Sequence, residues 1–76
     1  MAMTTLDCRG RPCPQPIIDL ARAFRDLMVG EEITVEADDP AAAYDIPAWC
    51  RMRSQEYVRE GRADDGTPLY VVRKIS

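Results

Sequence analysis

The alternation of apolar and polar positions along the chain predicts six regular elements. A short strand is expected over residues 5–8, where Leu6 and Cys8 would share one face. From Pro14 to Gly30, apolar residues recur at steps of three and four, which is typical of a helix that buries one side. The apolar positions of this helix are Ile17, Leu20, Ala21, Phe24, Leu27 and Met28. Gly30 is expected to end it.

A second strand and a second helix are expected in the middle of the chain. Residues 32–37 alternate, which predicts a strand with Ile33, Val35 and Ala37 facing inward. Asp39 suits an N-cap and Pro40 a first helical position. Because Pro47 follows closely, we expect a broken helix whose main part covers residues 47–56. Trp49, Cys50 and Arg53 would share one face of that part.

Two further strands close the chain and decide the fold class. Residues 57–62 and 69–75 are separated by the turn signal Asp64-Asp65-Gly66 with Pro68, so they should form a hairpin. We therefore predict an α+β fold over a single domain, residues 1–76, with the order strand–helix–strand–helix–strand–strand. The simplest packing is a two-layer sandwich in which two helices cover one face of a mixed four-stranded sheet.

Composition and charge narrow the class of protein. The chain has 76 residues, 46% of them apolar, which supports a globular core rather than disorder. The net charge is −3 and no basic run exists, which argues against direct nucleic-acid binding. No segment approaches the ~18 consecutive apolar residues of a membrane-spanning helix, and no leader pattern stands at the start. We expect a soluble cytoplasmic protein.

Three cysteines and the absence of histidine limit the chemistry. Cys8, Cys13 and Cys50 form no even disulfide framework, and a reducing compartment favours free thiols. Without histidine, Cys–His and Ser–His–Asp catalysis and imidazole metal sites are excluded. No C-x2–4-C pair is present, so we expect neither a metal nor a cofactor. Cys50 is interpreted as a core residue.

The run Cys13-Pro14-Gln15-Pro16 is the segment that carries chemistry. Prolines are tolerated in the first turn of a helix but not in its interior, so Pro14 and Pro16 mark the helix start. Cys13 then lies at or just before the N-cap. There the helix dipole stabilises a thiolate, and Arg9 and Arg11 add positive potential. A buried packing role for Cys13 is the alternative.

Other polar residues near this run have competing interpretations. Asp7 and Asp45 are candidates for orienting the loop through backbone N–H groups. Asp38 and Asp39 are better explained by helix capping than by acid–base catalysis. Gly10 forms the tight turn, and its two neighbouring arginines either stabilise the anion and dock a partner or are simply solvated. Cys8 is either an inward-facing strand residue, which we favour, or a resolving thiol that forms a disulfide with Cys13.

The stretch LDCRGRPCPQP at residues 6–16 resembles the D-x-x-G-x-x-C-P-x-P signature of the TusA (SirA-like) sulfur-carrier family. Ala37-Asp38-Asp39-Pro40, Asp45-Ile46-Pro47 with Cys50, Asp65-Gly66 and Arg73-Lys74 resemble later parts of the same family. The resemblance spans essentially the whole chain. Two departures stand at the site: Arg11 follows Gly10 where many members have an aliphatic residue, and Ala21-Arg22 replaces a basic pair.

The resemblance implies a two-layer α/β sandwich similar to the C-terminal domain of translation initiation factor three. It also implies a persulfide on Cys13, loaded by a cysteine desulfurase or a rhodanese and passed to an acceptor protein. Destinations in the family include tRNA thiolation, cofactor biosynthesis and sulfur metabolism. Such a protein is a stoichiometric carrier rather than a conventional enzyme.

Two other functions compete with the sulfur carrier. One is a non-catalytic interaction or regulatory module that uses the Trp49 helix as a docking face. The other is a thiol redox protein that uses Cys8 and Cys13, although C-x4-C is not the usual redox spacing. We expect a monomer, because a carrier must present Cys13 to two different partners.

Overall fold

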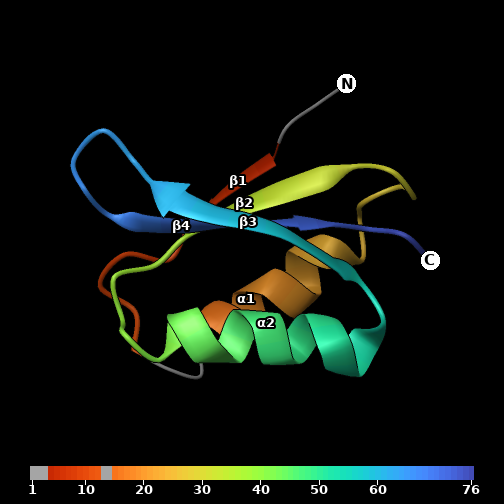
Figure 1. Ribbon diagram of the computed structural model, residues 1–76, viewed down its shortest axis with the longest axis horizontal. Helices are drawn as coiled ribbons and strands as arrows, with labels where there is room; N and C mark the ends of the chain where they lie inside the picture. Colours follow the sequence, from red (N-terminus) through yellow and green to blue (C-terminus); the bar gives the residue numbers. More distant parts are fainter. Residues whose placement is uncertain (1–3, 13–14) are drawn as a thin grey trace.

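The computed structural model describes residues 4–12 and 15–76 and shows the predicted order of elements. These are β1 (Thr4–Asp7), α1 (Gln15–Phe24), β2 (Glu32–Glu36), α2 (Ala42–Arg53), β3 (Glu56–Arg62) and β4 (Pro68–Arg73). The strands form one sheet in the order β1-β2-β4-β3, and both helices lie on one face of it (Figure 1). The predicted two-layer α+β architecture is confirmed.

The pairing of the strands makes the sheet mixed. β1 runs parallel to β2, whereas β4 is antiparallel to both β2 and β3. Because β1 and β2 are parallel, the segments that follow them leave the sheet at the same edge. The β3–β4 turn returns to that edge as well, so three connections meet there (Figure 1).

The core lies between the sheet and the two helices. β2 contributes Ile33 and Val35, which are fully buried as predicted, and α1 contributes Leu20 and Phe24. The other buried apolar residues of this cluster are Cys8, Leu27, Ala37, Ala42, Ile46, Trp49, Cys50, Tyr70 and Val72. The rings of Phe24 and Trp49 meet edge to face at 5.1 Å between centroids and join the two helices.

α1 is shorter than the sequence pattern predicts. It ends at Phe24, and the next backbone N–H groups donate to carbonyls three residues back, as in a 3₁₀ turn. Lys74 of the C-terminal segment donates its Nζ to the carbonyl oxygens of Phe24 and Leu27, at 3.4 and 2.8 Å. Leu27 stays buried, but Met28 is 73% exposed, so its predicted place on the buried face is wrong.

α2 is continuous, so the predicted break at Pro47 is wrong. Proline lacks the N–H that would serve the carbonyl of Ala43, but Ala43 is exposed and water can take that hydrogen bond. The N-cap is Ala41 rather than the predicted Asp39. Asp39 accepts the backbone N–H of Ala41 at 2.9 Å and stabilises the turn ahead of the helix.

The end of α2 is set by a left-handed residue. Ser54 has φ 57°, and the N–H of Gln55 donates to the carbonyl of Cys50 at 2.9 Å, so the helix ends at Arg53, before the predicted Glu56. Cys50 is buried, as predicted, and so is Trp49. Both helices end at the edge of the sheet opposite to the one where they begin (Figure 1).

The packing between α1 and the sheet generates a stability prediction. Leu20 is fully buried, so Leu20→Ala removes apolar contacts and leaves a cavity; we expect a loss of about 3 kcal/mol in the free energy of unfolding. Ile18 on the same helix is 40% exposed, and Ile18→Ala should cost less than about 1 kcal/mol. Urea unfolding measures both variants. Equal losses would contradict this assignment of the buried face.

Candidate functional site

A carboxylate from the segment that follows β2 holds the loop between β1 and α1. Gly10 has φ +75°, a conformation that favours glycine, and its N–H points at Asp38, which follows β2. The Gly10 nitrogen lies 3.1 and 3.0 Å from the two carboxylate oxygens of Asp38. The capping role predicted for Asp38 is therefore wrong, because its carboxylate serves the loop. We call residues 8–12 the site loop.

Arg9 ties the site loop to the β3–β4 turn. Its guanidinium contacts Asp7 through Nε and Nη2, each at 3.0 Å, and Asp65 through Nη1 at 2.8 Å. The backbone N–H of Arg9 also donates to Asp7 at 3.1 Å, as predicted for a loop-orienting aspartate. Arg9 is thus shared between two carboxylates rather than left as a free positive charge.

These contacts shift the acidity of all three side chains. Hydrogen bonds from Arg9 to the charged form lower the pKa of Asp7 to about 2. Hydrogen bonds from Thr67, and then from Arg9, lower the pKa of Asp65. The same carboxylates raise the pKa of Arg9 further above its ordinary value. All three groups therefore stay charged at neutral pH.

Asp19 of α1 contacts one residue of the site loop and one of the helix. It was not identified as a site residue from the sequence. Its carboxylate accepts Nε2 of Gln15 at 2.9 Å and lies 3.5 Å from Nη1 of Arg11. Along the chain, Arg11 and Gln15 stand two positions before and after Cys13. The spacing of Gln15 and Asp19, four residues apart on a helix, was the one available signal.

Cys8 lies behind this cluster as a buried, protonated thiol. It is fully buried, and its Sγ lies 3.8 Å from a carboxylate oxygen of Asp19. Burial and the Asp19 carboxylate raise the pKa of Cys8 to about 11. Burial likewise raises the pKa of Cys50 to about 11. The interpretation of both cysteines as inward-facing residues is confirmed.

The structure describes only some of the remaining predicted site residues. Cys13 and Pro14 lie outside the described residues. Pro16 is buried in the first turn of α1, which begins at Gln15, and Asp45 is half-buried in the first turn of α2. Both helices begin at the sheet edge where the site loop lies (Figure 1).

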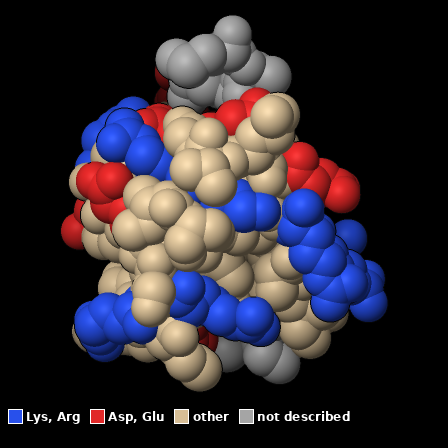
Figure 2. All heavy atoms as spheres, turned by 90° about the vertical axis from the view of Figure 1, so that its right-hand side faces the viewer, with Lys and Arg blue, Asp and Glu red and all other residues tan. Residues whose placement is uncertain are grey.

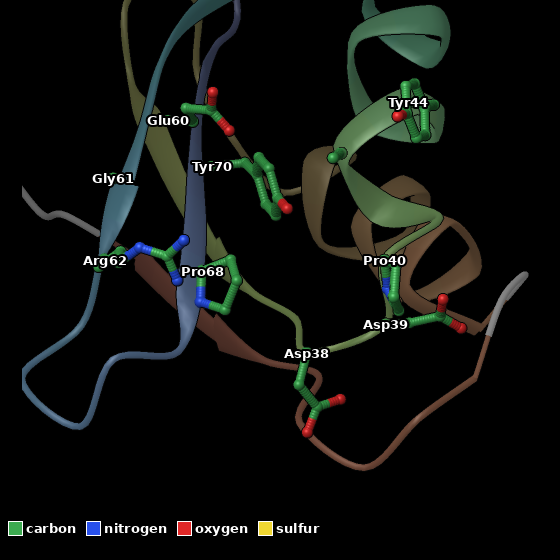
Figure 3. Close-up of a pocket in the computed structure, with 10 residues that line it drawn as sticks. Asp38, Asp39, Pro40, Tyr44, Glu60, Gly61, Arg62, Pro68 and Tyr70 are labelled. Carbon is green, nitrogen blue, oxygen red and sulfur yellow. The ribbon is translucent and has the colours of Figure 1, made fainter.

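A cavity of about 580 Å³ opens beside the site loop, between the sheet and the start of α2. Tyr70 and Glu60 stand on its sheet side, Pro40 and Tyr44 on its helix side, and Asp38 at the end next to the loop (Figure 3). Tyr44 is 78% exposed. The site loop is therefore flanked by an open cavity with an exposed tyrosine on its helix side.

Within residues 4–12 and 15–76, no three histidine, cysteine or carboxylate side chains come together as metal ligands. No helix of this described part is long and apolar enough to cross a bilayer.

Comparison with known proteins gives consistent results. The family described as "Sulfurtransferase TusA" matches residues 4–74. A protein of Archaeoglobus fulgidus named "Putative sulfur carrier protein" is 39% identical over 73 residues, which are 96% of this chain and 95% of that protein. The crystal structure of a SirA-like protein from Desulfitobacterium hafniense covers 99% of this chain and 100% of its own, with a TM-score of 0.81 and 20% identity. That likeness shows a shared fold.

The Asp7–Arg9 pair predicts a pH-dependent stability. Because the folded-state pKa of Asp7 is below its ordinary value of 3.8, its contribution is full above about pH 4 and is lost as the pH falls towards 2. The free energy of unfolding of the wild type should therefore fall more steeply over this range than that of Asp7→Asn. Urea unfolding at several pH values measures it. Asp64→Asn, a change at an exposed aspartate of the hairpin turn, should keep the wild-type slope.

The burial of Cys8 and Cys50 predicts selective thiol reactivity. In the folded Cys13→Ser protein at pH 8, both remaining thiols should react with a disulfide reagent at least about a hundredfold more slowly than after unfolding in guanidinium, because both are buried and protonated. Absorbance of the released thiolate follows the reaction. Rapid native labelling of Cys8 would contradict its assigned position and revive the redox alternative.

Proposed function

The chain belongs to the TusA family, and from this membership we propose that it carries transferable sulfur as a persulfide on Cys13. A sulfur-carrier role is the function that the family membership supports. The observation that carries the assignment to Cys13 is its place in the sequence. It precedes α1 by two residues, between Arg11 and Gln15, which Asp19 holds together.

The transfer needs no redox partner. The Cys13 thiolate attacks the terminal sulfur of a donor persulfide; a new S–S bond forms on Cys13, and the donor leaves as a thiolate. In the second step, an acceptor thiolate attacks the terminal sulfur on Cys13, and the Cys13 thiolate is released. The donor would be a cysteine desulfurase or a rhodanese, and the acceptor a protein cysteine. One sulfur atom moves at each step, and neither step is a net oxidation or reduction.

The start of α1 supplies the stabilisation that this chemistry requires. The first N–H groups of a helix lack partners within it, and the helix dipole favours an anion nearby. Arg11 is half exposed, and among the described residues its guanidinium pairs only with Asp19, at 3.5 Å, so it can also meet an anion or a partner. Arg9 is paired with two carboxylates and would act mainly by holding the site loop in place.

The supporting residues would act by fixing the loop. Gly10 supplies the turn, Asp7 orients Arg9, and Pro14 and Pro16 restrict the chain around the sulfur. A loop that is already ordered loses less entropy when it docks on a partner. For Asp45 we propose a role at the same edge, from its place in the first turn of α2. These roles rest on positions, and each can be tested by substitution.

Three contexts would use this carrier: tRNA thiolation, cofactor biosynthesis and sulfur metabolism. Each would occur in the cytoplasm and would use the carrier as a monomer between two partner proteins. The redox alternative loses support because Cys8 is buried with a pKa of about 11, so its thiolate is scarce near neutral pH. The interaction-module alternative keeps one observation in its favour, the exposed Tyr44 and Met52 on α2.

The persulfide is tested by loading the protein with sulfur. After incubation with cysteine and a cysteine desulfurase, the wild type should gain one sulfur atom that a reducing agent removes, as measured by intact mass. Cys13→Ser should gain none, whereas Cys50→Ser, which keeps Cys13, should load like the wild type. An equal gain by Cys13→Ser, or none by the wild type, would refute the proposal.

A further inference from the structure

A hollow with basic walls lies at the end of the molecule opposite the site loop. It has a volume of about 250 Å³ and lies where α1, α2 and β4 end. Its lining includes Phe24, Arg25, Trp49, Arg53, Gln55 and Lys74. Figure 2 faces this end and shows lysine and arginine side chains around a hollowed surface of other residues, with acidic side chains mainly towards the sheet.

Two cations of this hollow lie over aromatic rings, and neither makes an ion pair with an acid among the described residues. The guanidinium of Arg53 lies 5.9 Å from the ring centroid of Trp49, and Nζ of Lys74 lies 5.6 Å from that of Phe24. The ion pairs found among the described residues involve Arg9, Arg11 and Arg73 instead. Contact with a ring positions a cation but does not cancel its charge.

Capping of the helix ends accounts for only one of these cations. Lys74 donates to two carbonyl oxygens at the end of α1, which is the usual role of a basic residue at a helix C-terminus. Arg53 stands in the last turn of α2 and so complements the dipole of that helix, but neither its guanidinium nor that of the exposed Arg25 is hydrogen-bonded to a helix carbonyl among the described residues. Acids also stand at this end: Glu32 and Glu56 pair with Arg73, the neighbour of Lys74, and Asp26, which is exposed, follows Arg25. The backbone oxygen of Ser76, which lines the hollow, accepts a hydrogen bond from Nε2 of Gln55 at 3.3 Å.

The basic end contrasts with the charge of the whole chain. The net charge is −3, and many of the acids lie around the site loop at the other end, among them Asp7, Asp19, Asp38 and Asp65. An acidic surface would therefore be attracted to the hollow and repelled from the loop end. Electrostatic complementarity of this kind selects a partner and its orientation.

We propose that this hollow docks an acidic segment of a partner protein, with one carboxylate side chain between Arg25, Arg53 and Lys74. The volume suits a single side chain. A nucleic acid fits less well, because Trp49 is only 6% exposed and Arg53 lies over its ring, which leaves no face for base stacking.

The proposed surface is separate from the site loop. A partner bound there would leave the site loop accessible to a second protein, so one partner could hold the carrier while another exchanges sulfur with it. The inference goes beyond the persulfide chemistry and does not depend on it. Binding can be measured with the thiol removed, and sulfur loading can be measured without the acidic partner.

The test is a titration of ¹⁵N-labelled Cys13→Ser protein with a capped oligoglutamate peptide, followed by NMR. The indole N–H of Trp49 and the side-chain amide of Gln55 should shift, and the affinity should fall as salt shortens the range of the charges. Arg25→Glu should weaken binding at least about fivefold, and the neutral Arg25→Gln should weaken it less. Arg59→Glu, an equal charge change at an exposed arginine outside the hollow, should leave the affinity within about twofold.

Four results would overturn the proposal. They are an absence of shifts at the hollow, an equal loss with Arg59→Glu, inorganic phosphate that saturates the same residues as tightly as the peptide, and an RNA oligonucleotide that binds them more tightly. The last two would identify the hollow as a small-anion or nucleic-acid site instead. A persulfide test that fails while this titration succeeds would separate the two claims.

Discussion

The parallel pairing of β1 with β2 is the constraint on which the arrangement of the site depends. Parallel neighbours send their following segments to the same edge of the sheet, so Asp38 meets the N–H of Gly10 although the two are 28 residues apart in sequence. The β4 strand, antiparallel to β2, brings the hairpin turn and Asp65 to the same edge, within reach of Arg9. An antiparallel β1 would place the site loop at the other edge, away from these carboxylates.

Charge is distributed over the two ends of the molecule in opposite ways. At the site loop, Asp7, Asp38 and Asp65 hold Arg9 and the backbone of Gly10, so the charge of Arg9 is already paired. At the far end, Arg53 lies over the ring of Trp49 and Arg25 is exposed, so both charges remain available to a partner. One end thus fixes a short loop, and the other offers an attractive surface, which suits a protein that contacts more than one partner.

The features that were predicted correctly from the sequence are those that the local pattern of residues determines. The alternation in residues 32–37 and the turn signal at Asp64-Asp65-Gly66 identified β2 and the final hairpin, and the helical spacing identified the buried face of α1. Membership of the TusA family, suggested by the C-P-x-P run, agrees with the comparisons. These features depend on residues that are close together in the chain.

Two of the errors arose where contacts between distant residues decide, and a third where solvent does. α1 stops at Phe24 because Lys74, fifty positions later, satisfies its last carbonyls, and nothing in the local pattern contains that contact. Pro47 was expected to break α2, but the exposed carbonyl of Ala43 can turn to water. Asp38 looked like a helix cap from its neighbours, and its partner Gly10 became evident only once β1 and β2 were paired.

The central claim is that the start of α1 keeps the sulfur of Cys13 anionic and reactive. The most direct measurement is the rate of alkylation of Cys13 by iodoacetamide as a function of pH, in a protein whose other two cysteines are buried. We predict a midpoint well below the ordinary thiol pKa of about 8.5. A midpoint at or above that value would contradict the account.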